Sequence, residues 1–479
     1  MRTLVWFRHD LRTNDNTALH HAARAATNGV VGLFIVSPDE WRRHDVAPCK
    51  VEFILRTLRV LSDDLASKNI PLLIERAEKA ADVPALVRDI ARRHACDVVH
   101  CNTEYEINET IRDENAADLL REIGAAFHAH HDQCVIEPGS VRTKQDGAYT
   151  VFTPFKKTWF TVHDDRGGAP VLPAPKKQPE MPQGLAPSPA PERVEGYTSD
   201  VPAELHPGGE HAAMRRLTEF AQLRIGDYKT DRDYPAINGT SVISPYLAIG
   251  AISPRQCLRA ALDANDGRLD AGAPGAVHWI SELVWREFYK HILVAFPRVC
   301  MHRAFKPETD RLPWRYDEAE FQRWCDGQTG VPIVDAAMRQ LRATGWMHNR
   351  LRMIAAMYLT KDLFIDWRWG ERWFMRNLVD GDLASNNGGW QWSASTGTDA
   401  APYFRIFNPV SQSRRWDEQG EFIRHFVHEL IDLDDADIHD PSAIPGLLRS
   451  QIDYPEPMVD HRKARDRVMA AFRAIAGDK

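Results

Sequence analysis

The first 130 residues alternate short apolar runs with longer amphipathic segments. Leu4–Phe7 is an apolar run ended by charge, and the same pattern recurs four more times. The later runs are VVGLFIV (30–36), PLLIE (71–75), DVVHCN (97–102) and AAFHAH (125–130). Between them, residues 50–68 and 83–94 place apolar side chains at helical spacing. Strands and helices that alternate at these lengths predict a doubly wound parallel sheet, a Rossmann-like α/β domain.

A proline-rich segment interrupts this pattern between about 161 and 200. Proline at this density prevents regular structure and favours an extended tether. Beyond about residue 208, strand-like runs nearly vanish and amphipathic helical patterns dominate. These patterns cover residues 211–224, 253–265, 275–296, 332–344 and 349–367. We therefore expect an α/β domain over 1–132, an interdomain connection over 133–205 and an all-α domain over 206–475.

Composition narrows the class of protein. The 479 residues are 43% hydrophobic and 27% charged, as in a soluble protein of two or three domains. No apolar run approaches the roughly 20 residues that a membrane span needs, and the N-terminus meets charge too early for a secretory signal. Seven scattered cysteines form no metal-ligand spacing and favour reduced thiols. We expect a cytoplasmic protein without a metal site.

The net charge of −7 argues against a surface that is basic throughout and coats nucleic acid. It leaves room for a local basic groove, because arginines gather near residue 350 and between residues 405 and 416. Either run alone is more typical of a solvated helix face.

Residues 366–405 are the most distinctive stretch of the chain. Five tryptophans surround Asp380, Asp382 and the pair Asn386–Asn387. So many large rings require burial, whereas a hydrophobic core has little use for Asp-Gly-Asp beside Asn-Asn-Gly-Gly. Indoles are easily oxidised, so the stretch could hold and reduce a flat redox cofactor.

Three other segments carry candidate chemistry. Residues 239–244 bring hydroxyls around a glycine, a pattern typical of phosphate binding, although such serines often only cap helices. Residues 279–289 place tryptophans and Glu282 along one side of a helix, which favours a flat heterocycle if it is not plain core. In residues 345–353, asparagine and arginine suit base edges and phosphates.

The α/β domain also offers candidate ligand residues. Its first strand is not followed by GxGxxG, so a dinucleotide pyrophosphate site is not expected there. Asn108 and Glu109 follow the fourth strand and His44 follows the second, so these side chains could meet at the carboxyl edge of the sheet.

Four motifs together resemble the photolyase/cryptochrome family. They are WFRHDLRTNDNTAL (6–19), SELVWREFY (281–289), GWMHNRLRM (345–353) and DGDLASNNGGWQWSASTGTDAAPYFRIFNP (380–409). The resemblance runs from the first strand to about residue 460 and is strongest to class I photolyases that repair cyclobutane pyrimidine dimers, of the bacterial folate-antenna type. It implies an enzyme, a deoxyribodipyrimidine photo-lyase.

The resemblance implies FAD in a U shape, working as the reduced anion FADH⁻ and fed by a tryptophan chain of Trp390, Trp367 and Trp314. Asn386 would face the flavin N5, and Arg352 would pair with Asp380. The implied FAD contacts are Tyr228, Thr240, Ser241, Val242, Ile243, Ser244, Trp279, Arg286, Arg352, Asp380, Gly381, Asp382 and Asn386.

The family also implies UV-damaged DNA as the partner, with the dimer flipped out of the duplex, as photolyases do. Light would excite the reduced flavin, whose electron opens the cyclobutane ring and then returns. Glu282, Asn349 and Asn386 would be the catalytic residues. The implied lesion and DNA contacts are Arg232, Glu282, Trp285, Tyr289, Asn349, Arg350, Met353, Trp392, Arg405 and Gln412. We expect a monomer with no obligatory protein partner.

The implied antenna is 5,10-methenyltetrahydrofolate, held by His44, Asn108, Glu109 and Cys300. Met301 stands where the resemblance leads us to expect lysine, so a deazaflavin antenna or an empty site stays open. Two alternative functions also stay open. A cryptochrome-type photoreceptor shares the fold and FAD, but the residues that would clamp a dimer are all present. A (6-4) photolyase would be expected to carry histidines at Asn349 and Met353.

Overall fold

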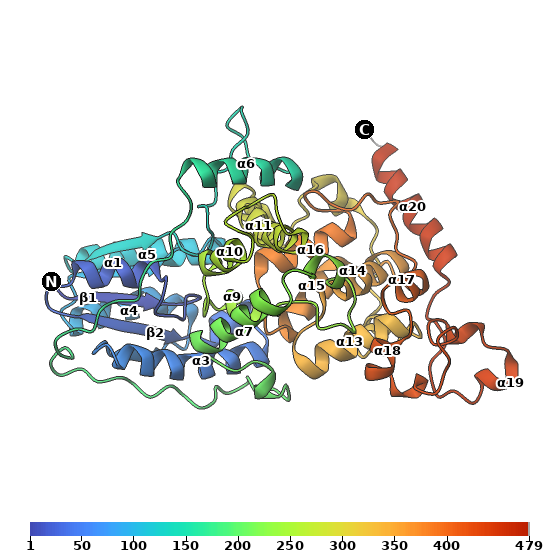
Figure 1. The fold of residues 1–479 in the computed structure, drawn as a ribbon, viewed down its shortest axis with the longest axis horizontal. Coiled ribbons are helices and arrows are strands. Elements are labelled where there is room, and N and C mark those ends of the chain that lie inside the picture. Colours follow the sequence, from blue (N-terminus) through green and yellow to red (C-terminus); the bar gives the residue numbers. More distant parts are fainter. Residues whose placement is uncertain (478–479) are drawn as a thin grey trace. The chain divides into compact units, whose positions relative to one another are not determined.

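The computed structural model describes residues 1–477, and its chain divides into two compact units (Figure 1). The first unit comprises residues 1–226, 241–300 and 379–381. The second comprises residues 227–240, 301–378 and those from 382 onward. The three consecutive segments expected from the sequence therefore differ from these interleaved units, and their bounds remain a prediction.

A five-stranded parallel sheet forms the centre of the first unit. The strands lie in the order β3-β2-β1-β4-β5, and every neighbouring pair is parallel. Their bounds are β1 Thr3–Phe7, β2 Val30–Val36, β3 Leu72–Arg76, β4 Val98–Asn102 and β5 Ala126–His130. All residues of β1, β2 and β4 are buried, which explains their continuous apolar runs. The predicted doubly wound sheet is confirmed.

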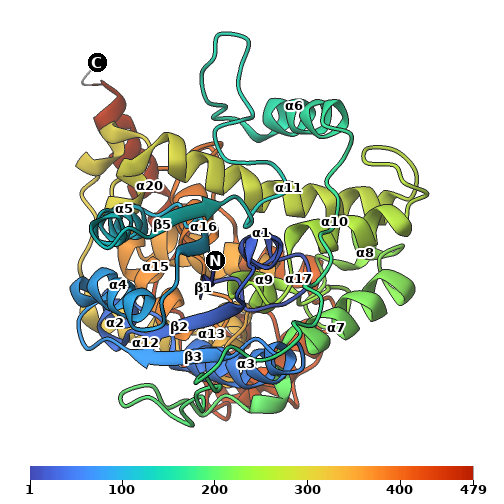
Figure 2. The ribbon, with the colours of Figure 1, turned by 90° about the vertical axis from the view of Figure 1, so that its left-hand side faces the viewer.

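Helices cover both faces of this sheet. Helices α1 (Thr17–Ala25) and α3 (Pro48–Ala66) lie on one face (Figure 2). Helices α4 (Val83–Arg93) and α5 (Ile107–Glu122) pack against each other on the other face. The short α2 (Pro38–Arg43) follows β2. In such a fold the carboxyl ends of the strands share one edge, where ligands usually bind.

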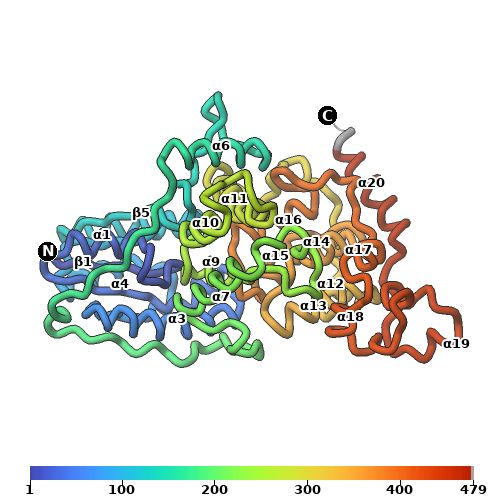
Figure 3. The backbone as a smooth tube through the Cα atoms, viewed as in Figure 1, coloured from blue at the N-terminus to red at the C-terminus, as the bar shows by residue number. Residues whose placement is uncertain are grey.

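The proline-rich segment is irregular, as predicted, but it is not a free tether. It has no helix or strand between residues 167 and 202 and runs along the α/β sheet (Figure 3). The Ser188 N–H donates to the Leu72 carbonyl at 2.8 Å, and the Gln178 N–H donates to the Lys68 carbonyl at 2.9 Å. Backbone hydrogen bonds to the edge strand β3 and to the loop before it thus fix a segment that forms no strand of its own.

Five more helices complete the first unit. They are α6 (Phe152–Asp165), α7 (Glu210–Leu223), α9 (Ser244–Ala248), α10 (Pro254–Asp263) and α11 (Pro274–Ala295).

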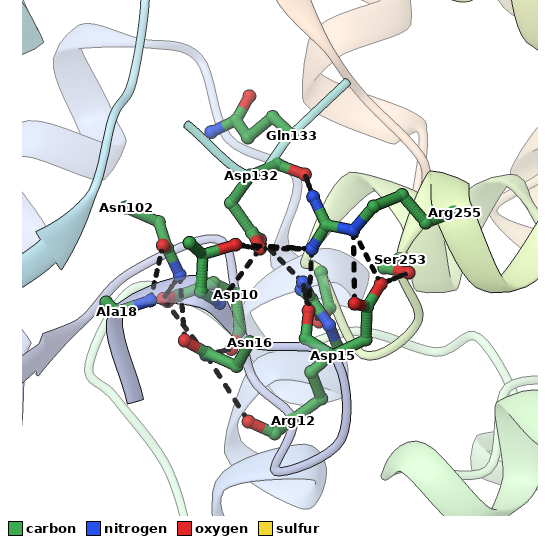
Figure 4. Close-up of polar contacts among 12 residues, drawn as sticks. Asp10, Arg12, Asp15, Asn16, Ala18, Asn102, Asp132, Gln133, Ser253 and Arg255 are labelled. Atoms are coloured by element: carbon green, nitrogen blue, oxygen red, sulfur yellow. Dashed lines mark hydrogen bonds and ion pairs between the residues drawn. The ribbon is translucent and has the colours of Figure 1, made fainter. Parts of the chain in front are cut away.

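A buried polar network joins the loop after β1 to α10 (Figure 4). Arg255 Nε donates to Asp15 Oδ2 at 2.9 Å, and Arg255 Nη2 donates to Asp132 Oδ1 at 2.8 Å. Arg12 Nη2 reaches the other Asp132 oxygen at 2.6 Å. Burial alone would raise the pKa of Asp132, but Arg12 and Arg255 hold it well below its usual range. Residues of the 6–19 motif are thus joined to α10 by buried ion pairs.

The second unit is helical and carries no β-strand within residues 1–477. Its helices are α8 (Tyr228–Asp231), α12 (Glu318–Cys325), α13 (Pro332–Thr344), α14 (Asn349–Met357), α15 (Trp367–Asn377), α16 (Leu383–Ala394), α17 (Pro409–Trp416), α18 (Glu421–Phe426), α19 (Gly446–Arg449) and α20 (His461–Gly477). Trp324, Trp367 and Trp390 lie in one buried cluster with Phe374 and Leu359.

The helix expected over 349–367 is interrupted. Helix α14 ends at Met357, a π-helical turn spans Tyr358–Asp362, and Phe364 adopts a positive φ of 57°. Within this π-helical turn, the buried Lys361 side chain donates to the Ala394 carbonyl and to Ser395 Oγ. Across the described helices of both units, none has the length and apolarity to cross a membrane.

Candidate functional site

Residues 241–244 of the first unit form a strained turn with free donors. Val242 has a φ of 47°, a region that β-branched residues rarely adopt and that is often found at functional sites. Within the described chain, the N–H groups of Ser241, Val242 and Ile243 donate to no protein acceptor. Trp279 Nε1 donates to Ser241 Oγ at 3.4 Å. The turn therefore offers three adjacent N–H groups and a hydroxyl.

Asp380 and Gly381 lie with this turn in the first unit. Ser244 Oγ donates to Asp380 Oδ2 at 2.6 Å. Lys50 Nζ, on α3, donates to the Gly381 carbonyl at 2.6 Å. The Ser244 contact brings together parts of two predicted FAD segments, residues 241–244 and 380–381. No sequence pattern marked Lys50, because nothing in an amphipathic helix shows which lysine turns inward.

The predicted stripe on α11 is present. Glu282, Trp285 and Tyr289 are all half-buried on this helix. The Glu282 side chain is 31% exposed, with His278 Nε2 3.7 Å from its carboxylate. Arg286 Nη1 donates to the Gln133 carbonyl at 2.6 Å. The side chain of Glu282 is therefore accessible to a ligand, rather than enclosed between the tryptophans.

One aromatic neighbour of this stripe was missed. The ring of Phe152, the first residue of α6, stacks on Trp285 with centroids 3.6 Å apart and planes 10° from parallel. A phenylalanine at the start of a distant helix has no periodic relation to α11, so no sequence pattern could pair them.

In the second unit, Asn386 and Asn387 are both held by Glu371 on α15. Asn386 Nδ2 donates to the Glu371 carbonyl at 2.9 Å, and Asn387 Nδ2 donates to Glu371 Oε1 at 2.8 Å. Asp382 caps α16 by accepting from the Ser385 N–H at 2.9 Å. Sequence reasoning missed Glu371, which lies among the tryptophans of α15.

Arg352 donates from Nε to the Met347 carbonyl at 2.8 Å. Its expected partner Asp380 belongs to the other compact unit, so their pairing stays a prediction.

The three chain tryptophans all lie in the core of the second unit. Trp367, Trp390 and Trp314 are 0%, 2% and 7% exposed. Trp390 contacts Phe374, with centroids 4.9 Å apart, and a Cβ on Gly370 would lie 2.1 Å from the Trp390 ring. None of the three indole N–H groups has a partner within the described residues. The rings are thus fixed by apolar packing, with Trp314 the most exposed.

The predicted DNA contacts of the second unit gather on α14 and its neighbours. Asn349, Arg350 and Met353 stand at the start of α14. Arg350 Nη2 lies 2.8 Å from Asp233 Oδ1, and its guanidinium lies 4.6 Å from the Trp416 ring centroid.

Three further DNA candidates of this unit have defined surroundings. Gln412 accepts from Trp416 Nε1 at 3.2 Å, and the Arg232 guanidinium lies over the Tyr228 ring at 5.3 Å. Arg405 is exposed. The lesion candidate Trp392 is half-buried on α16. Thr240, a predicted FAD contact, ends its segment of this unit.

The four antenna candidates meet in the first unit. His44 Nδ1 lies 3.2 Å from Glu109 Oε1, and Asn108 Nδ2 lies 3.3 Å from His44 Nε2. Burial, together with the nearby Glu106 and Glu109, raises the pKa of the Cys300 thiol to about 11. Burial, together with the nearby Glu106 and Glu104, raises the pKa of Glu109 to about 8. Glu109 is therefore mostly a neutral hydrogen-bond donor at pH 7.

A cavity of about 60 Å³ opens beside His44 and Glu109. Its wall is an ion network in which Arg112 Nη2 reaches Glu104 at 2.6 Å and Arg8 Nη1 reaches Asp113 at 2.9 Å. The Arg8 guanidinium also lies 4.5 Å from the Trp6 ring. Charged side chains thus occupy much of the interior at this edge of the sheet.

Comparisons with known proteins agree with this architecture. Residues 3–180 match the family model "DNA photolyase", and residues 279–474 match "FAD binding domain of DNA photolyase". The chain is 44% identical to the deoxyribodipyrimidine photo-lyase of Escherichia coli over 477 residues, which is 99% of each chain. It is 45% identical to the Salmonella typhimurium enzyme of that name, over 98% of each.

Solved structures show the same fold. A class III photolyase of Agrobacterium tumefaciens superposes with a TM-score of 0.87 at 34% identity, over 99% of this chain and 98% of that one. A Synechocystis cryptochrome gives 0.88 at 27% identity, over 98% and 99%.

An α/β unit and a helical FAD-binding domain are the features that these matches share. The chain belongs to the DNA photolyase family.

Proposed function

We propose that this protein is a light-driven lyase that splits cyclobutane pyrimidine dimers in DNA. The observation that carries the proposal is the 44–45% identity to deoxyribodipyrimidine photo-lyases along nearly the whole chain. Identity at this level covers both the FAD-binding domain and the segments that carry the predicted lesion contacts.

The residues of the first unit fit a dinucleotide cofactor such as FAD. Three adjacent free N–H groups beside the hydroxyl of Ser241 are the donors that a phosphate requires. Tyr228, Thr240 to Ser244, Trp279, Arg286 and Arg352 would hold FAD, together with Asp380 to Asp382 and Asn386. When bound and reduced, FAD supplies the photoexcited electron that opens the cyclobutane ring and then takes it back.

Glu371 supports the proposed role of Asn386. By accepting from the Asn386 amide N–H, the Glu371 carbonyl fixes the direction of that side chain. An amide offers no ionisable proton, so Asn386 would orient a flavin without protonating it.

Trp390, Trp367 and Trp314 would carry electrons inward during photoreduction. Their packing supports this role, because rigid apolar surroundings reorganise little when an indole loses an electron. The unpartnered N–H groups also give an oxidised ring no local acceptor for its proton.

Each unit contributes its own proposed lesion contacts. On α11, Trp285 would stack on the dimer, the accessible carboxylate of Glu282 would accept from a base edge and Tyr289 would pack beside them. In the second unit, Asn349 would bind a base edge, while Met353 and Trp392 would pack on the dimer. Arg232, Arg350, Arg405 and Gln412 would bind backbone phosphates.

For the antenna we infer a folate held by His44, Asn108, Glu109 and Cys300. A neutral Glu109 can donate to a heterocycle nitrogen or oxygen, as a folate ring would require. A tricyclic deazaflavin inside the sheet edge is disfavoured. The Arg8 and Arg112 ion pairs occupy that edge and would have to move to admit a third fused ring.

A blue-light photoreceptor is the second candidate, because the Synechocystis cryptochrome shares the fold at 27% identity. The higher identity to named photo-lyases favours repair. Asn349 and Met353 disfavour a (6-4) photolyase, as the sequence suggested. The monomeric state and cytoplasmic location stay predictions.

Light-dependent repair by the reduced protein tests the proposal. Dimer-containing oligonucleotide is incubated with purified protein in the dark and under near-UV or blue light, and the remaining dimers are counted. Dimers should disappear only in the light. Unchanged dimers in both samples would contradict repair and favour the photoreceptor.

A further inference from the structure

The stack of Phe152 on Trp285 is the closest aromatic contact of the α11 stripe. The two ring centroids lie 3.6 Å apart, whereas Phe288 and Tyr289 meet Trp285 at 5.6 and 5.7 Å in edge-on or tilted contacts. Phe152 is 6% exposed, whereas Trp285 is only half-buried. One face of the indole is therefore covered, and its exposed surface lies away from Phe152.

Contacts between α6 and α11 fix the position of Phe152. Trp159 Nε1 donates to the buried Glu287 carboxylate at 2.6 Å, and Phe155 packs against Phe288 at 5.1 Å. Figures 1 and 2 both show α6 lying along α11.

The segment that leads into α6 is anchored to the same helix. It is a hairpin in which Arg142 pairs with Ala148, and the Gly139 N–H at its base donates to His291 Nδ1 at 3.3 Å. Lys156 adds a bond from Nζ to Ser281 Oγ at 3.3 Å. Phe152 thus enters α6 between two fixed attachments to α11.

We propose that Phe152 is a positioning residue for lesion binding, an inference that rests on the proposed function. It holds the Trp285 ring in one rotamer and presents the opposite face to one pyrimidine of the dimer. An indole that is ordered before binding loses less side-chain entropy when a base stacks on it. The class of ligand that gains from this order is a flipped base, not the phosphate backbone.

Equilibrium binding in the dark separates this role from simple core packing. Dissociation constants are measured for duplexes with and without a dimer, using wild type, Phe152→Leu, Phe152→Tyr and Phe160→Leu. Phe160 is a half-buried phenylalanine of the same helix that contacts Trp159, so it is the matched control. Circular dichroism melting shows whether each variant is folded.

Phe152→Leu should weaken dimer binding by about 3- to 10-fold, the range of one aromatic pair, and leave undamaged DNA unchanged. Phe152→Tyr keeps the ring and should bind as wild type does, and so should Phe160→Leu. In a Trp285→Leu background, Phe152→Leu should change dimer binding by less than about twofold, because under this proposal Phe152 acts on binding through the Trp285 indole.

Three outcomes overturn the proposal. The first is equal loss on damaged and undamaged DNA, and the second is full additivity with Trp285→Leu. The third is dimer binding by Phe152→Leu that equals wild type. A wild type that does not distinguish dimer from undamaged DNA would instead overturn the proposed function, and the role of Phe152 with it.

Discussion

Buried cations in the two units have opposite surroundings. In the first unit, Arg12 and Arg255 share the carboxylates of Asp15 and Asp132, all of them buried. In the second, Lys361 is fully buried, and its partners within the described residues are the Ala394 carbonyl and Ser395 Oγ. Burial lowers its pKa to about 7, and Lys306 contributes in the same direction. No carboxylate pairs with it among residues 1–477.

This difference follows from what each interior must do. A paired network resists movement, because separating its charges in a low-dielectric interior is costly, so it suits loops that must hold a fixed shape. Trp314, Trp367 and Trp390 pack among apolar side chains, so their surroundings would reorganise little in the proposed electron transfer.

Breaking the paired network should have the largest effect. Asp132→Asn leaves Arg12 and Arg255 short of a negative charge and should lower the free energy of unfolding by about 3 kcal/mol. Urea denaturation measures the change. Asp326→Asn removes one partner of the exposed pair with Arg342 and should cost less than about 0.5 kcal/mol. Equal costs would mean that burial of the first network is unimportant.

Replacing the isolated lysine should instead change a pH dependence. With a folded pKa of about 7 and a usual value of 10.5, the folded protein binds fewer protons between these limits. Wild type should therefore lose stability as pH falls from about 10 to 7, by roughly 3 kcal/mol from this group, with little further loss below 7.

Lys361→Met should remove that slope, as urea midpoints at pH 7 and pH 10 would show. Lys306→Met, at a half-buried neighbour, is the control and should keep most of it. If Lys361→Met and wild type have parallel pH profiles, Lys361 is charged in the fold.

Replacing one tryptophan of the proposed electron-transfer chain should slow photoreduction. Trp367→Phe should slow photoreduction of the oxidised protein by at least about tenfold, equivalent to 1.4 kcal/mol. Repair by enzyme that was chemically reduced beforehand should remain. Trp369→Phe, on the same helix but packed against Phe321, should affect neither. Loss of both activities in Trp367→Phe would assign it to packing rather than electron transfer.

Local patterns predicted the elements of this fold well. The run VVGLFIV became β2 with its predicted ends, because a strand buried on both faces needs an unbroken apolar run. The helix expected over 349–367 was wrong in its second half, where Lys361 turns inward to α16. Its partner lies 33 residues away, beyond the reach of helical periodicity.

The residues of the candidate site also fall into those that the sequence revealed and those that it did not. Residues that carry polar groups in unusual surroundings, such as Asp380 and Asn386, were visible in the sequence. Lys50, Phe152 and Glu371 were not, because each is an ordinary residue for its own helix. Their roles come from contacts between distant segments, such as Lys50 with Gly381 and Glu371 with Asn386.

The smallest expected effect tests Glu109, the buried acid beside His44 in the first unit. Burial raises the pKa of Glu109 to about 8, so Glu109→Gln replaces a mostly neutral carboxyl at pH 7 with a neutral amide of similar shape. The amount of the proposed folate antenna that copurifies, or that rebinds to stripped protein, should stay within about twofold. Above pH 8 wild type should release folate as Glu109 ionises, whereas the variant should retain it. His44→Leu, which removes the ring between Asn108 and Glu109, should weaken folate at every pH. If Glu109→Gln loses the folate at pH 7, the carboxylate is the form that binds, and the buried acid is paired by its ligand.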